Sequence, residues 1–563
     1  MEAVWVLAAA ALLVGAVALG RRNRRKRLEK YLSAHWGNRG AREEPDRETI
    51  EEISAYWRCL RQAESPRDAV DDITWNDLEM DAVFARLDYA ESGVGEEALY
   101  AALRQTGVNG EALEARKRFA RAIKEHPDHR LRIRVLLHQL GRSRAYGACA
   151  YLFRPTAQRV EHGFVYPLLA ALPLAVAALG FLRPAFLLGL IAVFGVNAVV
   201  YYLTQKKWQP EVAGVRHLAA VLKAAGKLRS VLPPEMSGLA ERLDALCAEM
   251  KPMARWNALF AMQRQSDLDF LTDYLRILFQ LDMLCLIRLT AFFRAHNAAL
   301  RELYALVGEL DACVAIAAWR ASGVACCEPE IVSELCVRAE GLAHPLLRHP
   351  VPNDIVWDRG ALITGSNASG KSTFTKALAV NAILAQSVCL CTAKSFRLPR
   401  ARVTTSMALR DDLLSGESYF IVEIRSIRRI VEAVEEGTPT LCFIDEILRG
   451  TNTVERIAAS CALLNYLQGG RCLCMAATHD QELTTLLKNY RQFHFREEIT
   501  PSGMSFTYRL HEGPADTRNA IRLLKQMRFP EALTQEALAL AERFDRTRRW
   551  TLNEQESERA TDI

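Results

Sequence analysis

A single apolar stretch, residues 164–203, constrains the fold of this chain more than any other feature. It reads FVYPLLAALPLAVAALGFLRPAFLLGLIAVFGVNAVVYYL, and its one charged residue, Arg183, is followed by Pro184. A helix of about 20 apolar residues crosses the roughly 30 Å hydrocarbon core of a bilayer. The stretch is therefore long enough for two crossings joined by a turn at Arg183 and Pro184. The alternative is a helical hairpin buried in a soluble core, which would be unusually long and poor in charge.

A second apolar run lies at the start of the chain. Residues 3–20 carry no charge and are followed by RRNRRKR at residues 21–27. In a cleaved signal peptide the positive charge precedes the apolar run. We therefore expect an uncleaved anchor over residues 1–20, with its basic flank in the cytoplasm. Three crossings would place residues 21–163 and 204–563 on the cytoplasmic side of the cell membrane.

Composition bounds the remaining possibilities. The 563 residues exceed a single core, which rarely grows past about 250–300 residues, so several domains are expected. A net charge of +6 neither demands nor excludes nucleic acid, because binding depends on how charge is clustered. The 14 cysteines lack the spacings of a zinc site, and the CLC pairs at Cys389–Cys391 and Cys472–Cys474 are expected to be buried thiols.

The pattern of elements changes along the chain. Apolar residues at helical spacing predict helices before and after the hairpin, whereas ALIT, TLCFID and CLCMAAT predict strands that alternate with helices. Such alternation is typical of an α/β fold with a mostly parallel sheet. We divide the chain into an anchor at 1–20, a helical region at 21–163, a transmembrane hairpin at 164–203, a second helical region at 204–330, an α/β domain at 331–512, a helical segment at 513–549 and a polar tail at 550–563.

The loop after ALIT carries the strongest chemical signal. Its sequence GSNASGKS satisfies GxxxxGK[ST] and lies between a predicted strand and a predicted helix. In such a loop, backbone N–H groups hold phosphate oxygens, Lys371 adds positive charge at the β- and γ-phosphates, and the Ser372 hydroxyl can bind Mg²⁺. The residues expected to bind the nucleotide are Gly365, Ser366, Asn367, Ala368, Ser369, Gly370, Lys371, Ser372 and Thr373.

Two further strands end in polar residues at the edge where ligands bind in open α/β sheets. TLCFIDEI delivers Asp445, a candidate ligand for Mg²⁺, and Glu446, a candidate catalytic base for water. CLCMAATHD delivers His479, which can sense or stabilise a γ-phosphate. We therefore expect Glu446 and His479 to be catalytic, with ATP and Mg²⁺ as cofactors.

The segments GLAHPLL, VPNDI, ITGSNASGKST, GESYFIVEI, FIDEILRGTNTVER and ATHDQEL together resemble the ATPase domain of the MutS family, the mismatch-repair clamps within the ABC class of P-loop ATPases. DDITWNDLEMD and SGVGEEALYAALRQTG look like pieces of the core and lever helices of that family. The layout is similar to membrane-anchored MutS-like proteins, and nothing in the sequence resembles the mismatch-reading domain.

The resemblance implies composite sites in a homodimer. Gly416 and Ser418, in LSGESYF, would reach the γ-phosphate bound in a partner subunit. A loop of five residues would lie at the dimer interface, and residues 513–549 would form the dimerisation segment. The five residues are Arg449, Gly450, Thr451, Asn452 and Thr453. Many relatives have Pro, Met and Gly in place of Ser366, Ala368 and Ser369, and no aromatic residue directly precedes VPNDI, so adenine selectivity stays open.

The function implied is an ATP-driven dimeric switch whose levers act on duplex DNA. The basic cluster KSFRLPRAR, residues 394–402, is a candidate phosphate contact, and RRNRRKR is a candidate contact for anionic lipid. Two other functions stay open: a transporter-coupling ATPase, with Asn197 as a polar residue in the middle of the predicted hairpin, and a membrane scaffold in which ATP controls protein partners.

Overall fold

The computed structural model describes residues 19–20, 22–38, 45–66, 68–107, 110–142, 146–154, 160, 162–253, 269–366, 369–407, 419–500, 503–515, 521, 524–525, 527–547 and 550. Within this part the chain divides into two compact units. The helical unit contains residues up to Ala69, Asp81–Val324 and Gln386–Cys389, and the sheet unit contains Val70–Met80, Ala325–Ala385 and the residues from Leu390 onward. Of the predicted anchor at 1–20, only Leu19 and Gly20 lie among the described residues.

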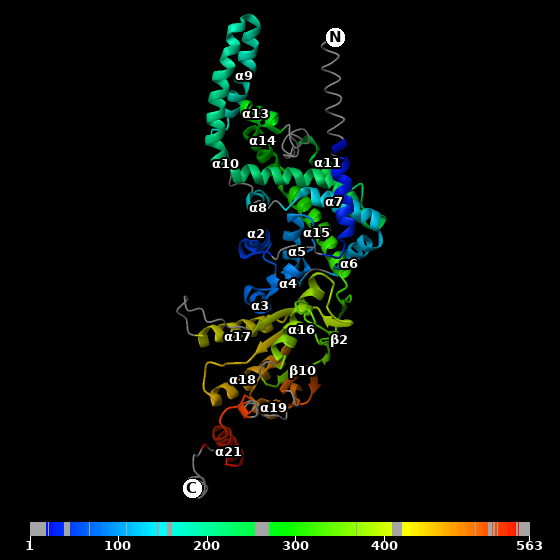
Figure 1. Ribbon diagram of the computed structural model, residues 1–563, viewed down its shortest axis with the longest axis vertical. Coiled ribbons are helices and arrows are strands. Elements are labelled where there is room, and N and C mark those ends of the chain that lie inside the picture. The colour runs from blue at the N-terminus through cyan, green and yellow to red at the C-terminus, as the bar shows by residue number, and fades with distance from the viewer. Residues whose placement is uncertain are drawn as a thin grey trace. The chain divides into compact units, whose positions relative to one another are not determined.

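The elements that the structure describes in the helical unit are helices, as the apolar spacing predicts (Figure 1). Its elements are α2 (Arg47–Glu64), α4 (Met80–Leu87), α5 (Gly93–Leu103), α6 (Gly110–Glu125), α7 (Pro127–Leu140), α8 (Tyr146–Phe153), α9 (Val165–Leu182), η1 (Pro184–Leu188), α10 (Gly189–Leu228), η2 (Pro234–Met236), α11 (Ser237–Glu249), η3 (Lys251–Met253), α13 (Asp269–Leu278), α14 (Leu281–Ala295) and α15 (Asn297–Arg320).

The apolar stretch forms a helical hairpin, with α9 and α10 joined through Arg183 and η1 (Figure 1). The segments Val165–Leu182 and Pro184–Thr204 are long and apolar enough to cross a membrane, and only 17% and 6% of them are buried. This exposure argues against the buried-hairpin alternative. The second helix does not end at residue 203 but continues to Leu228, because nothing before Pro210 interrupts it and Pro210 itself is accommodated within the helix.

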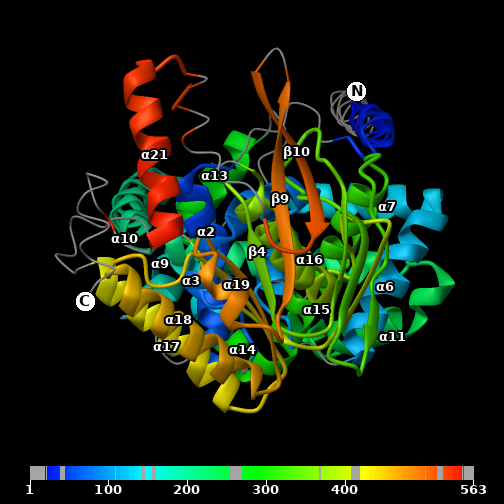
Figure 2. The same ribbon diagram turned by 90° about the horizontal axis from the view of Figure 1, so that it is seen from below.

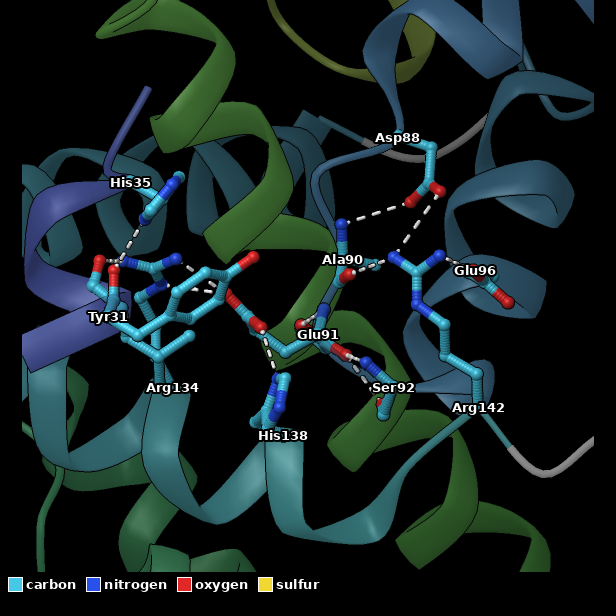
Figure 3. A network of polar contacts seen from close by, with 12 residues as sticks. Tyr31, His35, Asp88, Ala90, Glu91, Ser92, Glu96, Arg134, His138 and Arg142 are labelled. Carbon is cyan, nitrogen blue, oxygen red and sulfur yellow. Dashed lines mark hydrogen bonds and ion pairs between the residues drawn. The ribbon is translucent and has the colours of Figure 1, made fainter. Parts of the chain in front are cut away.

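A buried polar network ties the helical unit together (Figure 3). The Glu91 carboxylate accepts a hydrogen bond from Arg134 Nε at 2.8 Å and lies 3.1 Å from His138 Nδ1. Asp311 on α15 accepts hydrogen bonds from the backbone N–H groups of Glu91 and Ser92, at 3.0 and 2.8 Å, and from the Ser92 hydroxyl at 2.5 Å. The segment that leads into α5 is therefore joined to α7 by opposite charges and to α15 by hydrogen bonds to Asp311.

The sheet unit contains two sheets. Its strands are β1 (Glu330–Val332), β2 (Val337–Leu342), β3 (Asn353–Trp357), β4 (Ala361–Thr364), β5 (Ser395–Pro399), β6 (Arg402–Ser406), β7 (Thr440–Asp445), β8 (Cys472–Ala477), β9 (Arg491–Thr500) and β10 (Gly503–Glu512). The larger sheet has the order β10-β9-β4-β8-β7-β6, and only the β10–β9 pair is antiparallel. Figure 2 shows β4, β9 and β10 side by side. The predicted mostly parallel sheet is confirmed; the smaller sheet has the order β1-β5-β2-β3.

Helices pack against the larger sheet and enclose its core. The helices of this unit are α3 (Asp72–Asp77), α16 (Lys371–Ser387), α17 (Tyr419–Glu435), α18 (Thr453–Gln468), α19 (Glu482–Leu486) and α21 (Glu531–Thr547). Helix α17 packs on β6 and β7, and α18 packs on β8. The cysteines of both CLC pairs are buried thiols, as expected, and those on β8 belong to the core beneath α17 and α18.

The sequence analysis did not foresee that residues 70–80 belong to the sheet unit. Helix α3 packs against β6, which is the last strand of the larger sheet. The Asp77 carboxylate accepts hydrogen bonds from Thr405 Oγ1 at 2.7 Å and from the N–H of Met407 at 3.0 Å. Arg429 on α17 contacts Asp71 and donates to Thr74 Oγ1 at 3.1 Å. The free edge of a sheet invites unwanted pairing, and α3 protects it.

Candidate active site

The loop between β4 and α16 has the backbone of a phosphate-binding loop. Gly365 and Gly370 have φ angles of 141° and 109°, which side chains rarely allow. A Cβ atom on Gly365 would lie 2.6 Å from the carbonyl oxygen of Phe495, so glycine is required there. Lys371 begins α16, and its Nζ donates to the carbonyl oxygens of Gly365 and Ser366 at 2.7 and 2.8 Å.

The other predicted nucleotide-binding residues lie around this turn. Ser369 is buried, and its hydroxyl has no partner among the described residues. Ser372 and Thr373 are exposed in the first turn of α16. Asn367 and Ala368 lie outside the described residues, as do Gly416 and Ser418 of the predicted signature segment. The described part of the loop has the shape and charge of an anion site at a helix N-terminus, which suits the phosphates of a nucleoside triphosphate.

Ser372 and Asp445 meet at the end of β7. The Ser372 side chain forms a hydrogen bond with the Asp445 carboxylate; burial raises the pKa of Asp445, and this hydrogen bond lowers it in part. Asp445 Oδ1 is buried and has no partner among the described residues. A hydroxyl and a carboxylate oxygen are hard ligands of the kind Mg²⁺ prefers. These residues therefore fit the predicted Mg²⁺ site.

Glu446 and His479 are brought together by the pairing of β7 with β8. Asp445 lies opposite Ala477, and the N–H of Glu446 donates to the carbonyl of Ala477 at 2.9 Å. His479 Nε2 is 3.1 Å from Glu446 Oε1 and 3.3 Å from Lys371 Nζ. Because β8 lies between β4 and β7, the imidazole is delivered between the phosphate loop and the predicted base.

Arg449 also contacts the Glu446 carboxylate. Burial by itself raises the pKa of Glu446, but the hydrogen bonds from His479 and Arg449, together with their charges, outweigh burial and lower the pKa to about 2. The carboxylate is therefore held ionised, as an acceptor. It can orient a water molecule by accepting its proton in a hydrogen bond.

The loop after Glu446 holds an unusual backbone conformation. Glu446 and Leu448 have φ angles of 58° and 57°, in the left-handed region that favours glycine. The buried Glu423 on α17 accepts a hydrogen bond from the N–H of Arg449 at 3.3 Å, and the N–H groups of Leu448 and Gly450 also stabilise its charge. A Cβ on Gly450 would lie 2.9 Å from Phe420 Cβ. Helix α17 therefore supports the catalytic loop directly.

The predicted dimer-interface loop leads into α18. Asn452 caps this helix by accepting from the N–H of Glu455 at 3.0 Å, and Thr451 Oγ1 donates to Glu455 Oε2 at 2.9 Å. Thr453, the first residue of the helix, is exposed. These contacts define the loop within one chain, and its place in a dimer stays a prediction.

Three residues of the site were missed by the sequence analysis. Glu423 lies in GESYFIVEI, where a carboxylate on the apolar face of a helix was an available signal. Arg456 forms a paired ion bridge with Asp480, at 2.9 and 2.7 Å, next to His479. Tyr508 is an exposed aromatic ring close to Gly370, where a Cβ would lie 3.2 Å from the ring; such a ring can stack on a planar base. Its nearness to the loop depends on a bulge in β10 that the sequence does not reveal.

Two of the four basic residues in the predicted DNA contact at residues 394–402 form ion pairs within the sheet unit. Arg397 lies 3.5 Å from Glu330, and Arg402 forms an ion pair with Glu436 at 2.8 Å. Basic side chains that are already paired offer less charge to a phosphate backbone.

Comparison with known proteins agrees with this geometry. Residues 361–545 match the family model of MutS domain V. This range begins at β4 and contains every predicted site residue. The resemblance to the MutS family is therefore confirmed for this part of the chain.

Individual relatives extend the similarity somewhat further. The DNA mismatch repair protein MutS of Lactobacillus delbrueckii subsp. bulgaricus is 32% identical over 268 residues, which is 45% of this chain and 31% of that protein. The proteins of the same name from Caulobacter sp. (strain K31) and Thermus caldophilus are 32% and 30% identical, over 45% and 46% of this chain and 30% and 32% of theirs. The chain spans about a third of the length of the curated relatives it matches.

Proposed function

We propose that the protein is a membrane-anchored, MutS-like ATPase that hydrolyses ATP at composite dimer sites and uses the cycle to drive a clamp or switch. One observation carries the proposal: Lys371, Glu446 and His479 converge at the carboxyl ends of three neighbouring parallel strands, with His479 Nε2 within 3.3 Å of both other side chains. This constellation suits phosphoryl transfer to water, which needs positioning and charge more than covalent chemistry.

The residues have separate roles in this proposal. When bound, ATP and Mg²⁺ supply the phosphoryl group and the charge that stabilises its transfer. Ser372 and Asp445 would hold the metal, Lys371 would neutralise the phosphates, and Glu446 would orient the attacking water. His479 would report on the phosphate to Glu446, because it contacts this carboxylate. Lys371→Ala should abolish nucleotide binding by fluorescent ATP titration, whereas retained binding would contradict the proposal.

The dimer is proposed from the family resemblance. Gly416 and Ser418 of one subunit would complete the site of the other, with Arg449–Thr453 at the interface. A Ser418→Ala chain mixed with a Lys371→Ala chain tests this: two half-damaged subunits should form one intact composite site and regain part of the ATP turnover that each lacks alone. Failure of complementation in a mixture shown to contain heterodimers would argue for independent sites.

Membrane anchoring is proposed from the exposed apolar hairpin and the apolar run at residues 1–20. It places the protein in the cell membrane as a multi-pass protein with the ATPase domain in the cytoplasm. A reporter that works only in the cytoplasm should be active when it is fused after Ile563, and a reporter that works only outside the cell should be inactive there. A reporter that becomes active outside the cell would overturn this topology.

Duplex DNA is the proposed substrate of the switch, by analogy with the mismatch repair proteins named above. ATP turnover of the detergent-solubilised protein with and without duplex DNA tests this. Stimulation that weakens with added salt would support DNA as the substrate. ATP turnover that does not change when DNA is added would favour the alternative of a membrane scaffold or transporter-coupling ATPase. The ion pairs of Arg397 and Arg402 also favour this alternative.

A further inference from the structure

Helices α13 and α14 are separated by a break at Phe279 and Gln280, next to the apolar hairpin. Gln280 has a φ angle of 49°, and it is fully buried. Helix α13 packs on α10, and α14 packs on both α9 and α10 (Figure 1). From sequence these two helices belong to the cytoplasmic region at 204–330, so their position beside the hairpin is unexpected.

Two buried amide side chains donate to two of the carbonyl groups at the break. The last carbonyl groups of a helix have no partner within it, and each one left unsatisfied in an apolar medium costs several kcal/mol. Asn197 Nδ2 donates to the carbonyl oxygen of Leu278 at 2.6 Å, and Gln280 Nε2 donates to that of Ile277 at 3.2 Å. The same two side chains also join the break to the hairpin, because Asn197 Nδ2 donates to Leu169 O at 3.1 Å and Gln280 Nε2 to Asn197 O at 2.7 Å.

These contacts fix the level of the break along the hairpin. Asn197 lies inside the candidate span Pro184–Thr204, about 10 Å from its end at Thr204 for a rise of 1.5 Å per residue. At the start of α14, Asp282 accepts from the Tyr201 hydroxyl at 2.8 Å and lies 3.5 Å from Arg216. Arg216 follows the end of the span, and the break at Gln280 lies at the level of Asn197, about a third of the way into a 30 Å core.

Helix α13 exposes apolar side chains beside the hairpin. Tyr274 and Leu275 are 56% and 43% exposed, and the Tyr274 ring lies 5.9 Å from that of Phe194 on α10. The same stretch of α10 carries other exposed apolar side chains, including Val196 and Val199. The charged residues of this helix turn, Asp273 and Arg276, lie 3.4 Å apart and neutralise each other, as charged groups near lipid tend to do.

We propose that the α13–α14 turn enters the cytoplasmic leaflet beside the hairpin and that Tyr274 and Leu275 contact lipid acyl chains. The inference rests on the proposed membrane anchoring. A break in a helix is tolerated at membrane depth only where protein satisfies its backbone, and Asn197 and Gln280 do so for the carbonyl groups of Leu278 and Ile277. The membrane region of the protein would then contain a re-entrant pair of helices in addition to the predicted crossings.

Photocrosslinking of the full chain in nanodiscs of phosphatidylethanolamine and phosphatidylglycerol tests the proposal. The variant is Leu275→p-benzoylphenylalanine, and mass spectrometry measures lipid adducts at that position. Phe181→p-benzoylphenylalanine, on α9 where the side chain is 93% exposed, is the positive control. Glu241→p-benzoylphenylalanine, at an exposed position of α11, is the negative control.

Lipid adducts at Phe181 and Leu275, with background yield at Glu241, are the expected result. Adducts at Phe181 alone would overturn the re-entrant turn while leaving the hairpin in the membrane. Background yield at all three positions would show that the proposed anchoring itself is wrong. The two failures are therefore distinguishable.

Discussion

Two groups of buried polar residues, one in each unit, differ in how completely they are supplied with hydrogen-bond and ion-pair partners. In the helical unit, Glu91 is matched by Arg134 and His138, and Arg142 reaches both Glu96, at 3.0 Å, and the carbonyl of Ala90, at 2.9 Å (Figure 3). In the sheet unit, Asp445 Oδ1 and the Ser369 hydroxyl are buried without partners among the described residues.

The two regions also differ in backbone conformation, which is regular around Glu91 and strained around Glu446. The network around Glu91 joins regular helices, whereas Glu446 and Leu448 occupy left-handed conformations that cost on the order of 1–3 kcal/mol each. Buried polar groups without partners and local strain are typical of sites completed by a ligand. The comparison therefore distinguishes residues that stabilise the fold from residues that serve catalysis. Substitutions in the first group should lower stability, and substitutions in the second should lower ATP turnover.

The largest effect is expected from Arg134→Ala. It leaves Glu91 buried without its main partner, and such a loss costs about 3–5 kcal/mol of unfolding free energy. Hydrogen exchange of peptides from α5 and α7 would measure the lost protection. Arg132→Ala, at an exposed position of the same helix, is the control and should change little. Equal protection in both variants would show that the network does not stabilise the helical unit.

Glu446→Gln should act on catalysis and not on stability. The amide retains the size of the side chain but loses a proton acceptor, so ATP turnover should fall about 100-fold while nucleotide binding persists. Steady-state kinetics and a denaturation curve on the same sample measure both properties. Glu482→Gln, on an exposed carboxylate of α19, should match the parent protein. Unchanged turnover in Glu446→Gln would refute the role assigned to this residue.

A smaller effect is expected from Glu423→Gln. The amide would turn an N–H donor toward the N–H groups of residues 448–450 and loosen the catalytic loop, so kcat should fall about tenfold with KM little altered. Glu432→Gln removes an exposed carboxylate from the same helix, where the pair with Arg428 contributes little. A KM effect without a kcat effect would indicate that Glu423 serves binding and does not position the loop.

The smallest effect is a shift in pH dependence for Arg449→Gln. Arg449 helps to lower the pKa of Glu446 to about 2, so the parent protein should show no acid limb from this group in kcat/KM down to mildly acidic pH. Without the guanidinium, the pKa should rise toward the ordinary value of 4.5, and activity should begin to fall at a higher pH. A profile identical to that of the parent would mean that His479 alone keeps Glu446 ionised.

Much of the sheet unit could be predicted because its signals are local. Gly365, Gly370 and Lys371 lie within a single short loop, and Asp445 and Glu446 lie at the end of an apolar strand. Apolar periodicity and strand direction therefore place both groups at the same edge of the sheet. The backbone conformation of residues 448–450 could not be predicted, because it is supported by Glu423 and Phe420, which lie on another element.

The helical unit was predicted less completely. Helix type follows from apolar spacing, but the partners of Asp311 and Gln280 are set by tertiary packing between residues far apart in sequence. The same reason explains why residues 70–80 were assigned to the helical region: a short helix carries no signal for the strand that it covers. The pairing of Arg397 and Arg402 with acidic residues likewise appears only once the chain has folded.

The placement of α3 on β6 has a consequence for biosynthesis. Residues 72–77 leave the ribosome long before residues 402–406, and the apolar hairpin is made between them. The cover for the sheet edge is thus already present when the strand that needs it emerges, and an aggregation-prone edge would be exposed only briefly. A fragment that begins near Ala325 would lack α3 and therefore the cover for β6. Recombinant production should therefore retain the segment from Val70 onward.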